Sequence, residues 1–260
     1  MNVKFMLGFI KYYLTAQSKH DVHSPFVFSL VKNVILPDNQ SSDFTGIEKI
    51  RKQLSKRKQL ILSEDFGAGH HGIAIKEQTV GAITRNSSKH ARYCRLMYRL
   101  VKYFKSGNII ELGTSFGIST MYLAKGNPDG SIVTIEGSRV IAEIAESNFK
   151  TEKLENIRLM KGRFEDFLTD VLENMPSVDF IYIDGNHALQ PTLSYFEQIL
   201  EKSHKNTIFV IDDINWSSEM QEAWSFIKHH PKVSVTVDLY MLGLVFLNPD
   251  MSKENFVIRY

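Results

Sequence analysis

The sequence predicts an α/β protein whose core is a doubly wound sheet of seven strands that ends in an antiparallel hairpin. From about residue 107 onward, short β-branched segments alternate with segments of helical periodicity. Five strand–helix units in succession favour a parallel sheet with helices on both faces. The last two strands, 233–239 and 242–247, are separated only by Tyr240 and Met241. This connection is too short for a crossover helix and therefore predicts the hairpin.

The individual elements follow from the spacing of apolar residues. Parallel strands are expected at 108–112, 131–135, 157–160, 178–183 and 207–211. The helices after them are expected to end near residue 125 and to cover 139–149, 164–173, 189–202 and 218–229. A further helix over 88–105 precedes the first strand, because Met97, Leu100 and Val101 fall on one face at helical spacing.

Residues 1–87 are expected to form an N-terminal helical extension or lid, and residues 88–260 the cofactor-binding domain. Ser24 followed by Pro25 is typical of a helix start, and predicts a helix to about residue 35. A second helix is expected over 46–57, and the glycine-rich segment 66–72 is expected to be a loop. The extension carries histidines that we interpret as surface or lid groups: His20, His23, His70 and His71.

Charge and composition exclude several classes of protein. The 260 residues include 31 basic and 29 acidic side chains, and this near balance gives no overall sign of a nucleic-acid partner. Cys94 is the single cysteine, so an intrachain disulfide cannot form, which fits a reducing compartment such as the cytoplasm. No apolar stretch approaches the ~20 residues that span a bilayer, so no membrane is expected. A homodimer is left open.

The most informative motif closes the first strand of the sheet. It reads Glu-Leu-Gly-Thr-Ser-Phe-Gly over residues 111–117, with glycines at 113 and 117. Glycines allow a sharp turn and a close approach of the backbone to a ligand. Their spacing differs from the Gly-x-Gly-x-x-Gly of dinucleotide-binding turns, and so favours S-adenosylmethionine, whose amino acid end Glu111 and backbone groups can bind. A tight turn without a ligand remains the alternative for this motif alone.

Two further strand ends fit a nucleoside. Glu136 ends the second strand, where an acidic side chain can accept both ribose hydroxyls. Arg163 and Phe164 follow the third strand, where the adenine would lie, so Phe164 is either a stacking partner or a core residue at a helix start.

Three carboxylates are expected to converge beyond strands four and five. Asp184 ends the fourth strand, and Asp212 and Asp213 end the fifth. Clustered carboxylates repel one another, and Mg²⁺ or Ca²⁺ would relieve that repulsion. In the alternative without a metal, Asp213 caps the next helix and Asp212 lines the pocket.

Segments 110–117, 183–185 and 212–216 together resemble the metal-dependent small-molecule O-methyltransferases, which are class I S-adenosylmethionine-dependent enzymes. The resemblance covers about 88–247 and implies a Rossmann-like seven-stranded sheet. The Asp212–Asp213 pair is more similar to the macrocin type than to the catechol and caffeoyl-CoA type. The macrocin type also has an acidic base two residues after the first ligand, where this chain has Asn186. His187 is then the nearest group able to act as a general base.

The expected function is transfer of a methyl group from S-adenosylmethionine to an oxygen of a small-molecule acceptor, with Mg²⁺ as an open option. The alternatives are an NAD-dependent oxidoreductase and a non-catalytic cofactor-binding or interaction protein. The expected cofactor-binding residues are Glu111, Gly113, Thr114, Gly117, Ser119, Glu136, Arg163, Phe164 and Asp184. The expected catalytic residues are His187 and Asp184, and the expected metal ligands are Asp184, Asp212 and Asp213.

Overall fold

The structure is a computed structural model that describes residues 3–19, 21–37, 43–65 and 74–260. The chain divides into two compact units, one of Met1–Asn39 with Ser177–Tyr260 and one of Gln40–Pro176. The expected division at residue 87 stays a prediction. The glycine-rich segment 66–72, with His70 and His71, lies outside the described residues, as does His20.

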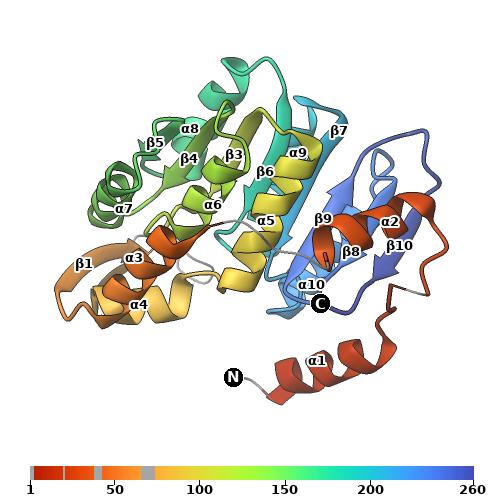
Figure 1. Cartoon of the computed structure of the whole chain (residues 1–260), viewed down its shortest axis with the longest axis horizontal. Coiled ribbons are helices and arrows are strands. Elements are labelled where there is room, and N and C mark those ends of the chain that lie inside the picture. The colour runs from red at the N-terminus through yellow and green to blue at the C-terminus, as the bar shows by residue number, and fades with distance from the viewer. Residues whose placement is uncertain (1–2, 20, 38–42, 66–73) are drawn as a thin grey trace. The chain divides into compact units, whose positions relative to one another are not determined.

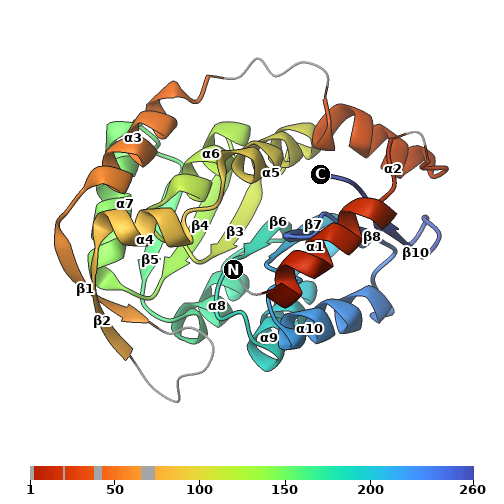
Figure 2. The same ribbon diagram turned by 90° about the horizontal axis from the view of Figure 1, so that it is seen from below.

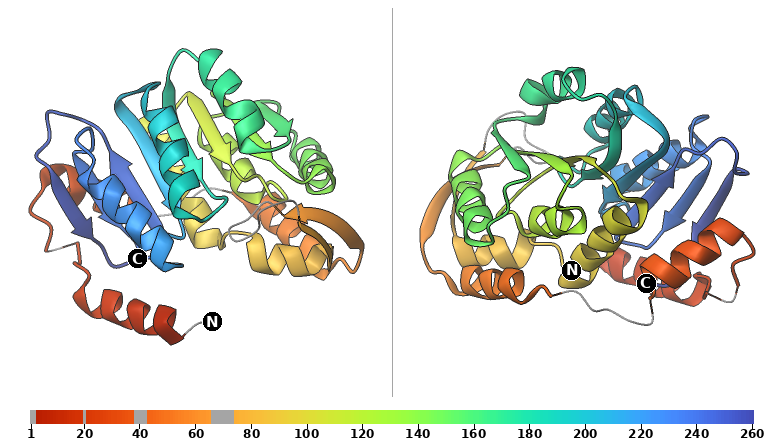
Figure 3. Two further views of the ribbon diagram at one scale, coloured as in Figure 1. Left: turned by 180° about the vertical axis from the view of Figure 1, so that it is seen from behind. Right: turned by 45° about the horizontal axis from the view of Figure 1, so that its top comes forward.

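The unit Gln40–Pro176 contains the first half of the predicted α/β pattern. Its parallel strands are β3 (Asn108–Leu112), β4 (Ser131–Glu136) and β5 (Ile157–Lys161), in the order β3-β4-β5. Its helices are α3 (Thr45–Lys56), α4 (Val80–Ser87), α5 (Ala91–Phe104), α6 (Ile118–Gly126), α7 (Arg139–Thr151) and α8 (Phe164–Glu173). In Figures 1 and 3, α5 and α6 cover one face of these strands and α8 covers the other. The strands are apolar on both sides because both faces are buried: Ile109, Ile110 and Leu112 are fully buried.

The unit that contains Ser177–Tyr260 carries the C-terminal strands. They are β6 (Val178–Ile183), β7 (Ser203–Asp212), β8 (Val235–Asp238), β9 (Leu242–Phe246) and β10 (Glu254–Val257), with helices α9 (Leu189–Leu200) and α10 (Ser218–His229). β6 and β7 are parallel, while β9 is antiparallel to both β7 and β8. The predicted terminal hairpin is therefore confirmed. β10 was not predicted; it pairs parallel to β8 and makes the described sheet eight-stranded rather than seven-stranded.

The extension is helical only in part. The expected helix from Ser24 becomes α2 (Pro25–Leu30) and a π-helical turn, η1 (Val31–Ile35), and Ser24 does accept the capping hydrogen bond from the Val27 amide. Further along, β1 (Leu60–Asp65) and β2 (Ala74–Thr79) form an antiparallel pair that was not predicted. Helix α1 (Val3–Thr15) precedes α2. Within the described part of the chain, no helix is long and apolar enough to cross a bilayer.

Candidate functional site

The loop between β3 and α6 depends on its glycines for backbone reasons. Gly113 and Gly117 have φ angles of 101° and 78°, in the region that favours glycine, and Ser115 between them has a φ of 48°. A Cβ atom on Gly117 would lie 2.3 Å from Cε1 of Phe149. Gly117 therefore allows α7 to approach the start of α6 closely, and the loop conformation is built into the fold.

Glu111 lies beneath this loop rather than at its surface. Its carboxylate is fully buried and accepts hydrogen bonds from the hydroxyls of Ser119 (2.7 Å), Thr120 (2.5 Å) and Thr134 (2.7 Å). The Thr114 and Thr134 hydroxyls are 2.6 Å apart. A buried carboxylate is costly unless it is hydrogen-bonded. Three hydroxyls satisfy that requirement, and they tie the end of β3 to α6, β4 and the loop.

Glu136, at the end of β4, accepts hydrogen bonds from two separate turns of the backbone. Its Oε2 accepts from the Ser115 amide at 2.8 Å, and its Oε1 accepts from the Ser138 amide at 2.9 Å. These two hydrogen bonds hold the side chain at the loop, where β4 ends.

Arg163 and Phe164 lie where β5 leads into α8. Arg163 is the N-cap residue of α8, and its amide donates to the Asp166 carboxylate at 3.3 Å. Its side chain is 55% exposed, with Nε 3.5 Å from an oxygen of Glu165. Phe164 is half-buried as the first residue of the helix. Both side chains are therefore partly accessible at the carboxyl end of the strand.

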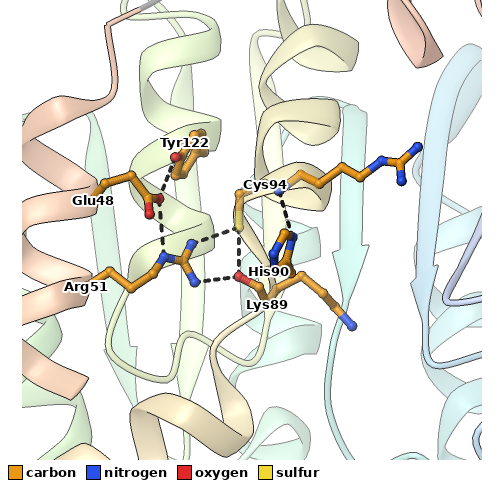
Figure 4. Close-up of polar contacts among 7 residues, drawn as sticks. Glu48, Arg51, Lys89, His90, Cys94 and Tyr122 are labelled. Atoms are coloured by element: carbon orange, nitrogen blue, oxygen red, sulfur yellow. Dashed lines mark hydrogen bonds and ion pairs between the residues drawn. The ribbon is translucent and has the colours of Figure 1, made fainter. Parts of the chain in front are cut away.

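A second polar network joins α6 to α3 and α5 (Figure 4). Tyr122 donates to Glu48 at 2.7 Å, and Glu48 also accepts from Nε of Arg51 at 3.2 Å. Arg51 then donates to the Lys89 carbonyl at 2.6 Å and to the Cys94 sulfur at 3.5 Å. Arg51 is therefore a largely buried structural cation that joins α3 to α5.

In the other unit, a phenol joins two of the three predicted carboxylates. The hydroxyl of Tyr182 is 2.8 Å from Oδ2 of Asp184 and 2.8 Å from Oδ2 of Asp212. Burial raises the pKa of Tyr182 well above its ordinary value, and the two carboxylates raise it further. The phenol therefore keeps its proton and acts as the shared donor. The sequence contained a signal for this contact, because residues two apart along a strand share a face.

His187 and Asn186 follow Asp184 in the same turn. Nε2 of His187 is 3.5 Å from Oδ1 of Asp184. Burial lowers the pKa of His187, but the hydrogen bond and charge of Asp184, with the charges of Asp212 and Asp213, outweigh burial and raise that pKa to about 9. His187 is therefore a cation at neutral pH in this arrangement. The Asn186 amide donates to the Tyr195 hydroxyl at 3.4 Å.

The turn after β7 places Asp213 away from the helix-capping position. Ser217, not Asp213, caps α10: its hydroxyl accepts from the Met220 amide at 3.1 Å. Asp213 has a φ of 51°, and its amide donates to Oδ1 of Asp212 at 2.8 Å. The helix-cap alternative for Asp213 is therefore wrong.

A cavity of about 560 Å³ opens beside the same turn, within the unit that holds Asp184 and Asp212. Aromatic side chains from α1, from the turn after β7 and from the β8–β9 connection line it: Phe5, Tyr12, Trp216 and Tyr240. Asn215 and Asp238 supply polar groups, and the Asn215 amide donates to the Tyr240 carbonyl at 2.9 Å. Helix α1, which was not predicted from the sequence, therefore forms one wall of this cavity.

Residues 110–214 match the family model described as a methyltransferase domain. The chain is 28% identical to a catechol O-methyltransferase of Niastella koreensis over 123 residues, which is 46% of this chain and 55% of that protein. It is 23% identical to the catechol O-methyltransferase of Mycobacterium tuberculosis over 130 residues, covering 48% and 56%. The chain thus spans about half the length of the curated relatives it matches.

Solved structures share the fold. The O-methyltransferase from Bacillus cereus in complex with S-adenosylhomocysteine superposes with a TM-score of 0.58 at 22% identity, covering 85% of this chain and 97% of that chain. The O-methyltransferase TomG from Streptomyces achromogenes, in complex with S-adenosylmethionine, has a TM-score of 0.53 at 22% identity, covering 63% and 82%. This chain therefore has the fold of these O-methyltransferase structures, and residues 110–214, which match the methyltransferase model, lie within it.

Proposed function

We propose that this chain transfers the methyl group of S-adenosylmethionine to an oxygen of a small-molecule acceptor. The observation that carries the proposal is the Ser115–Glu136 hydrogen bond of 2.8 Å, which joins the glycine loop to the end of β4 inside the segment that matches the methyltransferase model. A loop held in this way offers backbone groups and a carboxylate side by side, which suits a nucleoside with an amino acid tail. The nicotinamide alternative has no such support from the family match.

The residues of the cofactor site would divide into contacts and supports. Glu136, which is held beside the loop at the end of β4, would accept the ribose hydroxyls. The backbone from Gly113 through Thr114 to Gly117 would receive the amino acid end. Glu111 and Ser119 would position that loop from below, since their hydrogen bond of 2.7 Å is buried. On the adenine side, Arg163 and Phe164 would contact the ring.

We propose the aromatic cavity beside Trp216 as the place for the acceptor. Its lining by Phe5, Tyr12, Trp216 and Tyr240 suits a flat apolar ring, and Asn215 and Asp238 suit polar substituents on that ring. This lining favours an aromatic alcohol of the catechol kind over a sugar hydroxyl. Two relatives are named for catechol methylation, which agrees with that choice.

The donor set does not fit a resident magnesium ion. Tyr182 already bridges Asp184 and Asp212, and the described residues contain no group of three histidine, cysteine or acidic side chains able to hold a metal ion. The predicted ligand set of Asp184, Asp212 and Asp213 is therefore not preformed. No step of the proposed reaction is routed through a metal.

Chemistry in this proposal rests on alignment and proton removal. The acceptor oxygen attacks the methyl carbon in line with the departing sulfur, which needs positioning above all. His187 would take the hydroxyl proton in its neutral form, and Asp184 would orient the imidazole and stabilise the cation that forms.

A reducing compartment such as the cytoplasm suits the buried free thiol of Cys94.

Calorimetry and methyl-transfer assays test the proposal in two stages. The chain should bind S-adenosylhomocysteine and not NAD, and Glu136→Ala should weaken binding by about 1–3 kcal/mol. Glu143→Ala, at an exposed position of α7, is the matched control and should bind normally. Labelled methyl should then pass to a catechol and not to a methyl glycoside. Binding of NAD alone would refute the cofactor, whereas transfer to the glycoside alone would refute only the acceptor.

A further inference from the structure

Helix α1 has two apolar faces, of which one is packed and the other is not. The packed face contacts the body of its unit through Phe5, Tyr12 and Ala16, which gather around Tyr240. The opposite face carries large apolar side chains whose exposed fractions range from 45% to 74%: Met6, Leu7, Ile10, Tyr13 and Leu14. Their spacing of three and four residues makes this a continuous stripe along the helix.

The stripe belongs to an ordered, anchored helix and not to a frayed end. The Tyr12 hydroxyl donates to the Ile258 carbonyl at 2.5 Å and accepts from the Tyr260 amide at 2.9 Å. The Tyr240 hydroxyl bonds to the Phe5 carbonyl, and a Cβ on Gly8 would lie 3.0 Å from that hydroxyl. In Figure 1, α1 lies in red below the strands of its unit, and Figure 2 shows it from that side, in front of those strands. The orientation of the helix, and hence the exposure of the stripe, is fixed by these contacts.

Cationic side chains border the stripe, and no acidic residue lies on α1. The helix sequence Val3–Thr15 contains lysines but neither aspartate nor glutamate. Lys11 lies exposed on one flank, and Lys19 is exposed just beyond the helix. On the other flank the Arg259 guanidinium lies over the Tyr13 ring, 4.6 Å from its centroid. The whole surface is therefore apolar at its centre and positive at its rim.

We propose that α1 docks this protein onto an anionic phospholipid surface, with the stripe from Met6 to Leu14 among the acyl chains and Lys11, Lys19 and Arg259 against the headgroups. An apolar face bordered by lysines, with tyrosine at its margin, is the pattern of helices that lie in the plane of a membrane interface. A helix of 13 residues is too short to span a bilayer, and it does not need to do so here.

The charge pattern favours lipid over a second copy of the chain. In a two-fold contact through this stripe, the lysines of each copy would face those of the other with no acidic residue of α1 to pair with them. The contact would also be small, because 13 residues of helix extend only about 20 Å. A stable interface usually buries about 800 Å² on each partner, well above what one face of such a helix offers.

Docking would place the aromatic cavity next to the membrane, because Phe5, Gly8, Tyr12 and Thr15 of the same helix line that cavity. Lipid binding by the stripe does not depend on the identity of the cofactor or acceptor.

Vesicle flotation tests the inference. The full chain should float with vesicles of phosphatidylcholine and phosphatidylglycerol, and high salt should weaken this binding. Pure phosphatidylcholine should bind it less. The double variant Ile10→Glu/Leu14→Glu should lose about tenfold or more in partition, because two anchoring side chains become acidic. Phe226→Glu, which changes a 55% exposed aromatic on α10 in the same unit, is the matched control and should float normally.

Sedimentation equilibrium separates lipid binding from self-association. A wild-type chain that is dimeric, becomes monomeric in the double variant and does not float with anionic vesicles would overturn the inference in favour of a copy-to-copy contact. Flotation that the double variant retains would overturn it as well. Both variants should bind S-adenosylhomocysteine alike, so this experiment and the cofactor experiment fail independently.

Discussion

The Tyr122 hydroxyl on α6 donates to the Glu48 carboxylate on α3, 74 residues earlier in the chain, at 2.7 Å (Figure 4). Burial raises the pKa of Tyr122, and the hydrogen bond and charge of Glu48 raise it further, so the phenol remains a donor at every physiological pH. Tyr122 is fully buried, and α6 begins at the glycine loop. The contact therefore couples the extension to the helix that follows the candidate cofactor site.

Tyr122→Phe should destabilise the protein by about 0.5–1.5 kcal/mol, the net value of one hydrogen bond, with Glu48 still held by Arg51. Urea unfolding measures the difference. Tyr13→Phe, which removes a hydroxyl from a 50% exposed ring, is the control and should change stability by less than about 0.5 kcal/mol. Equal stabilities for the two variants would mean that the α3–α6 contact contributes nothing measurable.

The thiol of Cys94 should resist alkylation in the native protein. Burial raises the pKa of Cys94 to about 12, although the Arg51 charge acts in the opposite direction. The thiolate is the reactive form, so iodoacetamide near pH 8 should label Cys94 only when the chain unfolds. Mass spectrometry with and without urea checks this. Rapid native labelling would show that the α3–α5 packing opens readily.

The strand–helix alternation was predictable because it arises from local periodicity. The hairpin also followed from a local feature, the short connection at Tyr240 and Met241, and β8 and β9 confirm it. β10 was missed because Glu254–Val257 carries one apolar pair in an exposed setting and gains its pairing only from β8. Contacts between distant segments leave no comparable trace in a sequence.

In the candidate site, too, features that arise from local sequence were predictable, whereas contacts between distant segments were not. Glycines 113 and 117 could be identified from spacing, and both have the positive φ angles expected of a tight turn. The burial of Glu111 under three hydroxyls was not predicted, because it depends on α6 and β4 coming together. Tyr182 was not predicted as a site residue because it lies within an apolar strand, where a tyrosine is expected to be a core residue. Its function depends on Asp212, 30 residues further along the chain.

Tyr182→Phe tests whether the phenol, and not a metal, stabilises the two carboxylates. Removal of the shared donor deprives both Asp184 and Asp212 of that hydrogen bond. Because Asp212 is buried, the loss should cost about 1–3 kcal/mol of stability. Thermal unfolding of the wild type should be unaffected by Mg²⁺ or by a chelator. A clear rise in the wild-type melting temperature with Mg²⁺ would show that the carboxylates rearrange into a metal site.

The pH dependence of methyl transfer should report the protonation of His187. Its pKa of about 9 lies above the ordinary value of 6.5, so the imidazole is mostly protonated at neutral pH and cannot accept the acceptor's proton. The rate should therefore rise with pH, by about tenfold per unit below that pKa, and level off above it. His187→Gln should lower the rate and remove this rise. His204→Gln alters a second histidine–aspartate pair, with Nε2 2.8 Å from Asp179, and is the control that should keep the wild-type profile.

A wild-type profile that is flat across this range, or one that breaks near pH 6.5, would exclude His187 with a raised pKa as the base. Proton removal would then fall to solvent or to the acceptor's own acidity, and His187 would serve only as the cation that neutralises Asp184.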